Sequence, residues 1–106
     1  MYYRVRGRLR EETAVEFRGL LRDGTIARQK PDGQEIVDSM ARAVVTASGA
    51  VEWSEVCYCE APLQHERSTV YDRFFDDLTT EPVDGYQSHV GRPLLDYLDG
   101  LPDSTA

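Results

Sequence analysis

The chain has 106 residues, of which 41% are hydrophobic and 29% are charged, and its formal net charge is −7. This length and composition exclude a disordered chain and predict a single folded domain with its own core. The negative charge argues against a general nucleic-acid binder, because such proteins neutralise phosphates with a surplus of basic side chains. We assign residues 1–101 to one domain and interpret residues 102–106 as a disordered tail.

The charge is distributed unevenly along the chain. Residues 1–50 contain nine basic and seven acidic side chains, whereas residues 51–106 contain three and twelve. The two halves are therefore complementary, either within one fold or between the subunits of a homodimer. We find no apolar stretch long enough for a signal peptide or a membrane span, and two cysteines are too few for a secreted disulfide framework. These features predict a cytoplasmic protein without a membrane association.

Residues 2–10 alternate between apolar and basic side chains, which predicts a strand with one face on the core. The row of arginines on its other face is interpreted as a solvated face paired with Glu52, Glu55 or Glu60. An anion or RNA surface is the alternative. A helix is predicted over residues 13–23, because Thr13 and Glu16 have the spacing of a capping box.

Residues 25–30 lie between turn signals and form either a short edge strand or a loop. A second helix is predicted to about residue 46, with apolar side chains at helical intervals. Its β-branched end favours a competing interpretation, a hairpin that turns at Ser48 and Gly49. Residues 51–59 carry apolar groups on both faces, which is typical of a strand in the middle of a sheet.

The next predicted element is the main core helix, which starts at Pro62 or at Thr69 and ends before Pro82. Its apolar stripe comprises Val70, Tyr71, Phe74, Phe75 and Leu78. A polar edge strand over residues 83–90 and a short helix from Pro93 follow. The element order predicts an α+β fold of two layers, in which a sheet of three or four mostly antiparallel strands is covered on one face by helices. A ferredoxin-like or similar sandwich is the favoured arrangement.

Cys57 and Cys59 form the most specific candidate site in the sequence. On a strand, their side chains would share one face about 6.6 Å apart, which is poor geometry for a disulfide but allows two thiolates to share a metal. The candidate metal ligands are Cys57, Cys59, His65 and Glu66. Zinc is the cofactor that this chemistry favours, with Glu60 or His89 as further donors. Buried, inert cysteines are the more ordinary interpretation, and a redox pair is the third.

His65, Glu66 and Arg67 begin like a zinc-protease motif, but Thr69 stands where the second histidine is required. If the core helix starts at Pro62, His65 shares one helical face with Asp72 and Asp76. Such a face could serve acid–base chemistry, although a solvated surface is the simpler interpretation.

Phosphate-binding glycine loops and nucleophile motifs do not occur in the sequence. We therefore predict a non-enzymatic protein-interaction or accessory module that acts with a protein partner or as a homodimer, and not with nucleic acid. One alternative is a metal-binding or redox protein that uses Cys57, Cys59 and His65. Another is a small enzyme with a pocket at His65 and Asp72.

Overall fold

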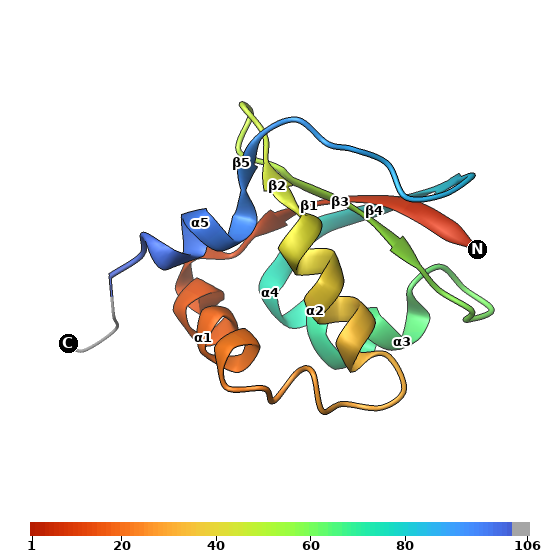
Figure 1. Cartoon of the computed structure of the whole chain (residues 1–106), viewed down its shortest axis with the longest axis horizontal. Coiled ribbons are helices and arrows are strands. Elements are labelled where there is room, and N and C mark those ends of the chain that lie inside the picture. The colour runs from red at the N-terminus through yellow and green to blue at the C-terminus, as the bar shows by residue number, and fades with distance from the viewer. Residues whose placement is uncertain (103–106) are drawn as a thin grey trace.

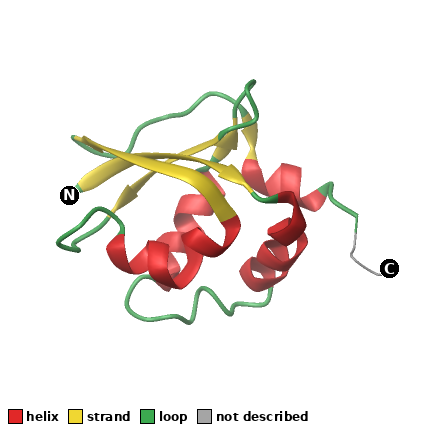
Figure 2. Cartoon of the chain, turned by 180° about the vertical axis from the view of Figure 1, so that it is seen from behind, coloured by secondary structure: helices red, strands yellow, loops and turns green. Residues whose placement is uncertain are grey.

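The computed structural model describes residues 1–102. They form a compact α+β domain with one five-stranded antiparallel sheet (Figure 1). Four helices lie together on one face of this sheet when α3, η1 and α4 are counted as one continuous helix (Figure 2). The predicted α+β class is therefore confirmed. The tail predicted for residues 102–106 lies, from residue 103 on, outside the described residues.

Helices and strands alternate irregularly along the chain. The first half of the chain contains β1 (Tyr2–Leu9), α1 (Glu11–Arg22), α2 (Gly33–Arg42), β2 (Val44–Val45) and β3 (Val51–Val56). The second half contains α3 (Gln64–Glu66), the π-helix η1 (Arg67–Tyr71), α4 (Asp72–Phe74), β4 (Phe75–Val83), β5 (Arg92–Pro93) and α5 (Leu94–Asp99). Residues 25–30, for which the sequence allowed either an edge strand or a loop, form a loop with turns.

The strand order in the sheet is β4-β1-β3-β2-β5, and each neighbouring pair is antiparallel. β3 is paired on both sides, as its two apolar faces predicted. The prediction of three or four strands was too low, because a two-residue edge strand such as β5 is too short to leave a periodic pattern. The ferredoxin-like topology stays a prediction.

The arginine row of β1 lies on the sheet face opposite the helices. Arg4 and Arg6 lie 3.0 and 3.8 Å from carboxylate oxygens of Glu52 on the neighbouring strand. The interpretation as a row paired across strands is confirmed for Glu52. It is wrong for Glu55, which is fully buried in the core, because successive residues of a strand point to opposite faces.

Both early helices differ from prediction at one end. α1 begins at Glu11 rather than at Thr13, and no side chain caps its N-terminus. Two acidic residues in its first turn favour this start through the helix dipole. α2 ends at Arg42 rather than near residue 46, and β2 follows in a hairpin with β3. The competing hairpin interpretation was therefore the correct one, in agreement with the β-branched side chains at this position.

The main core helix is shorter than predicted. It ends at Phe74, and the next residue begins the edge strand β4. Asp77 has φ +55° at a break in the β1–β4 register, so this strand is bulged. The bulge lets Phe75 and Leu78 both turn into the core although they are three residues apart, a spacing that resembles a helix. Pro82 is tolerated because β4 is an edge strand.

The predicted edge strand over residues 83–90 is also wrong, because the chain beyond Val83 forms a loop. This loop crosses the sheet face that the helices leave open (Figure 1). It is anchored on Ser54, whose hydroxyl accepts from the backbone N–H of Gln87 at 3.1 Å and lies 2.7 Å from Nε2 of His89. The short helix after Pro93 is confirmed as α5.

The core lies between the sheet and the helices. Its centre is aromatic, with Trp53 of β3 in contact with Tyr71 of η1 and Phe75 of β4 at ring-centroid distances of 5.1 and 5.2 Å. Phe17 of α1 stacks on Phe74 of α4. Within residues 1–102, each helix is too short or too polar to cross a lipid bilayer.

Candidate metal centre

The two cysteines lie in a turn after β3 and not on the strand itself. The backbone N–H of Cys57 still donates to the carbonyl of Met1, at 2.9 Å, and the chain then bends away from the sheet. Within this bend the backbone N–H of Cys59 lies 3.2 Å from Sγ of Cys57. The bend brings the thiols closer than the spacing of a flat strand would, with their sulfur atoms at most 4.8 Å apart.

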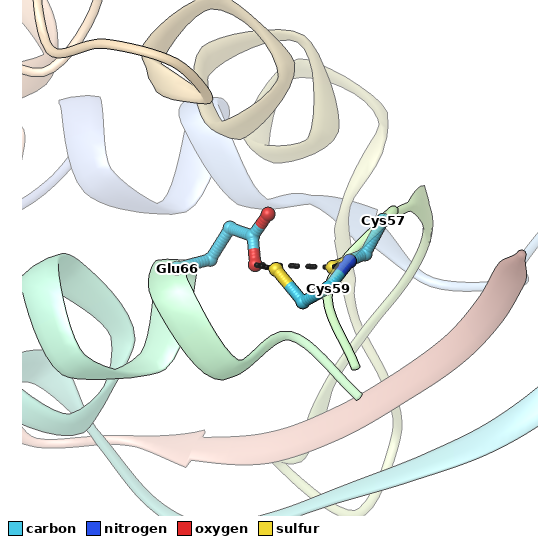
Figure 3. Close-up of side chains that lie close together, drawn as sticks. All are labelled: Cys57, Cys59 and Glu66. Carbon is cyan, nitrogen blue, oxygen red and sulfur yellow. Dashed lines mark hydrogen bonds between the residues drawn. The ribbon is translucent and has the colours of Figure 1, made fainter. Parts of the chain in front are cut away.

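Glu66 reaches the thiols from the helix that follows (Figure 3). Leu63 turns the chain into this helix with φ +54°, a conformation that is unusual for a large side chain. A π-helical turn follows, and residues 66, 70, 71 and 74 of the continuous helix are buried. Glu66 is only 2% exposed.

One oxygen of Glu66 accepts from both thiols. Its Oε2 lies 3.5 Å from Sγ of Cys57 and 3.8 Å from Sγ of Cys59. In a tetrahedral zinc site, a sulfur and an oxygen ligand lie about 3.6 Å apart and two sulfur ligands about 3.8 Å apart. The sulfur-to-oxygen distances within this trio of side chains therefore fit the edges of such a tetrahedron. A metal would replace the two S–H···O hydrogen bonds with three coordinate bonds.

His65 lies beside this trio but does not join it. Its Nδ1 makes a short contact with Oδ2 of Asp32, at the start of α2. The cluster of mutually close donor atoms, searched over residues 1–102, contains Cys57, Cys59 and Glu66. The structure therefore brings together three of the four side chains that the sequence singled out.

The two further donors that the sequence suggested are not in place. Glu60 is exposed. His89 contacts Ser54 and lies 3.8 Å from Glu52 on the opposite face of the sheet.

The trio lines a pocket of about 380 Å³ between β3, α2 and α3. Its walls comprise Pro31, Asp32, Glu35, Val56, Cys57, Tyr58, Cys59, His65 and Glu66. Asp32 and Glu35 were not predicted as members of this site, because their spacing is typical of an ordinary helix start. Glu35 lies on the first turn of α2, where its Oε2 accepts from the backbone N–H of Val56 at 3.1 Å.

Burial has the largest effect on the pKa values of Cys57 and Glu66. It raises the pKa of Cys57 to about 12, and it also raises the pKa of Glu66. Without a metal, Cys57 is therefore a neutral thiol, which is a poor nucleophile. The hydrogen bond with Asp32 raises the pKa of His65, which favours a positive charge at the rim of the pocket.

A second buried carboxyl group belongs to Glu55, which precedes the cysteines on β3. Its Oε1 accepts from the indole N–H of Trp53 and the hydroxyl of Tyr71. Its Oε2 has no hydrogen-bond partner among the described residues, and burial raises the pKa of Glu55 to about 8. The strand alternation had placed Glu55 on the same face as Trp53 and Cys57, so its burial could have been inferred from the sequence.

The acid–base face proposed for the core helix does not form. Asp72 pairs with Arg67 at 3.1 Å, whereas Asp76 lies on β4 and pairs with Arg10 at 2.8 Å. Since the helix ends at Phe74, the helical spacing on which that hypothesis depended does not extend to Asp76.

The fold and the pocket define a small α+β protein with a thiol and carboxylate cluster. Comparison of the chain with protein-family models, with curated proteins and with solved structures found no match.

Proposed function

We propose that the protein binds one divalent transition-metal ion of the zinc class through Cys57, Cys59 and Glu66. The observation that carries the proposal is the convergence of these three donors, within 4.8 Å of one another, on the wall of a pocket. Two sulfur donors favour zinc or a similar ion over magnesium or calcium, which prefer oxygen ligands.

A metal would also account for the burial of Glu66. A carboxyl group that is 2% exposed has lost its hydration, which costs free energy. The two hydrogen bonds from the thiols are weak and offset little of this cost. A divalent cation deprotonates thiols and stabilises the carboxylate directly. The trio is thus better matched to a bound cation than to a purely structural role.

Native mass spectrometry of protein purified without chelator tests the proposal. We expect one zinc equivalent in the wild-type protein and its loss in Cys57→Ser and Glu66→Gln. Glu60→Gln is the matched control, because this exposed carboxylate lies in the same segment and should keep the metal. Metal-free wild-type protein after incubation with excess zinc would contradict the proposal, as would equal loss in Glu60→Gln.

Metal binding should also stabilise the fold. A ligand that binds the folded chain alone at a concentration of about 1,000 times its Kd adds about 4 kcal/mol to the free energy of unfolding. We therefore expect EDTA to lower the Tm of the zinc-loaded wild-type protein and to leave the Tm of Cys57→Ser unchanged. An identical response of the two proteins to EDTA would count against a site at Cys57.

The protein-interaction role remains a second candidate. It is supported by the outer face of the sheet over β1 and β4, which the helices leave uncovered (Figure 2). A pocket there is lined by Arg4, Arg6, Thr79, Thr80 and Glu81. Such a polar surface would suit a homodimer or a partner that dissociates easily. The same mass spectra report the subunit number, and a monomer at all accessible concentrations would exclude the homodimer.

We also propose that the domain is an elaborated ferredoxin-like fold. The support is the order β4-β1-β3-β2 with antiparallel neighbours, in which helices connect β1 to β2 and β3 to β4. An additional helix in the first connection and the edge strand β5 would be the elaborations. An experimental structure with a different strand order would refute this assignment.

A further inference from the structure

We infer that the bound metal keeps one coordination position open to the pocket, and that this position accepts a small neutral nitrogen base in preference to an anion. The inference rests on the metal-binding function proposed above and adds a ligand class to it. Three protein donors with one exchangeable position are typical of zinc sites that act on a ligand, whereas structural zinc sites are closed by four protein donors.

The residues around the trio leave the fourth position unfilled. The cluster contains three donors and no fourth among residues 1–102. His65 is held by Asp32. The carboxylate of Glu35 is engaged as well, because it accepts from the N–H of Val56 and from Tyr86, whose hydroxyl lies 3.0 Å from Oε2.

The fully buried carboxyl group of Glu55 does not fill the position either. Glu55 lies outside the cluster of close donors and does not line the pocket. Its Oε1 is occupied by two hydrogen bonds from the core. A donor for the fourth position must therefore come from the pocket.

The pocket has room for such a ligand. Its volume of about 380 Å³ is at the lower end of the range for small-molecule sites. Pro31, Val56 and Tyr58 contribute apolar surface to its wall. A flat ring could lie against these side chains while one of its nitrogen atoms reaches the metal.

Charge decides which ligand fits. A divalent ion held by two thiolates and one carboxylate carries a net charge of −1, and the pocket wall also includes the carboxyl groups of Asp32 and Glu35. His65 and Arg42 lie against these two groups and offset their charge. The metal complex itself keeps its negative charge, so an anionic ligand would be repelled at close range, whereas a neutral nitrogen donor would not.

Cobalt(II) substitution of the full-length protein provides the test, because thiolate-bound cobalt has charge-transfer and visible bands that report its ligands. Imidazole, acetate and azide are titrated separately into the cobalt-loaded protein at constant ionic strength. We expect imidazole to shift the visible bands saturably and to bind at least about tenfold more tightly than either anion, a difference of about 1.4 kcal/mol.

The outcomes separate the two proposals. If no thiolate-to-cobalt band forms, the metal-binding function itself fails. If the band forms and imidazole leaves the spectrum unchanged, metal binding stands and the open position is refuted. Acetate or azide binding as tightly as imidazole would refute the preference for a neutral base. A response to imidazole in His65→Gln but not in the wild-type protein would show that His65 fills the position, which also overturns the inference.

Discussion

At the scale of single residues, Glu55 shows how a fully buried carboxyl group is tolerated. Two donors, the indole of Trp53 and the hydroxyl of Tyr71, converge on its Oε1. Burial favours its neutral form, as the raised pKa of about 8 indicates. Through Tyr71, the carboxyl group thereby links β3 to the continuous helix that carries Glu66.

Removing one donor to Glu55 should destabilise the protein. In Tyr71→Phe the ring contacts remain while Glu55 loses a buried hydrogen bond, so we expect the free energy of unfolding to fall by about 1–3 kcal/mol. Urea unfolding followed by tryptophan fluorescence measures this change. Tyr58→Phe is the control, because Tyr58 is 89% exposed and its substitution should change stability by less than about 0.5 kcal/mol. Equal effects in both variants would refute the role assigned to Tyr71.

Because of His89, we expect the stability of the loop that crosses the sheet to depend on pH. Burial lowers its pKa, and the nearby Glu52 and Arg4 act in opposite directions on it. Between this lowered pKa and the ordinary value of about 6.5, the unfolded chain binds a proton that the folded chain does not. The contribution of neutral His89 to the free energy of unfolding is therefore fully present above about pH 6.5. It is lost as the pH falls through the pKa of His89 in the folded protein.

Amide hydrogen exchange of Gln87 reports this change, since its N–H donates to Ser54 in the same anchor. After correction for intrinsic rates, its protection should decrease below about pH 6.5 in the wild-type protein. In His89→Gln the protection should vary less with pH. A wild-type profile that is flat from neutral to acidic pH would contradict the prediction.

At the scale of elements, two glycines in helices have opposite environments. A Cβ atom on Gly19 of α1 would meet no atom within 4 Å, whereas one on Gly33 of α2 would lie 2.1 Å from the carbonyl oxygen of Ile26. Gly19 is therefore not a position of close packing, whereas Gly33 is. Close approach at Gly33 fixes the start of α2, and with it the positions of Asp32 and Glu35 in the pocket.

Alanine at these two positions should therefore act in opposite directions. Gly19→Ala should raise the free energy of unfolding by up to about 1 kcal/mol through the helix propensity of alanine. Gly33→Ala should lower it by about 1–3 kcal/mol or more, because the clash involves backbone that cannot rotate away. Chemical denaturation of the two variants provides the comparison. Stabilisation by both substitutions would show that the contact at Gly33 is relieved easily.

At the scale of the whole molecule, a buried arginine ties the end of the described chain to its beginning. Arg18 of α1 is 6% exposed and donates to the carbonyls of Leu98 and Leu101, at 3.1 and 2.6 Å. The carbonyl of Leu98 also accepts from the backbone N–H of Leu101, and Leu101 itself lies beyond the end of α5. Arg22, one turn further along α1, pairs with Asp99 at the surface.

Methionine substitutions at the two arginines separate these roles. Arg18→Met should lower the free energy of unfolding by about 1.5–3 kcal/mol for each charge-assisted hydrogen bond whose carbonyl stays buried. Arg22→Met should change it by less than about 1 kcal/mol, because exposed ion pairs contribute little. Thermal unfolding and the hydrogen exchange of α5 measure both effects. Equal changes in both variants would mean that α5 does not depend on Arg18.

Local patterns were sufficient wherever side chains followed one period without interruption. The alternation in β1, the two apolar faces of β3 and the short helix after Pro93 were all predicted. Prediction failed at β4, where the bulge at Asp77 gave Phe75 and Leu78 a helical spacing. The signal there was ambiguous in itself, since a bulged strand and a short helix place apolar side chains at the same intervals.

Sequence patterns were enough to predict the α+β class, the inward faces of β1 and β3, and Cys57, Cys59 and Glu66 as candidate metal ligands. Tertiary structure alone decided that these three converge while His65 turns to Asp32. It also brought Glu35 of α2 into the pocket wall. The physical reason is that period and composition report which face of an element is buried. The distance between side chains on different elements depends instead on how those elements pack.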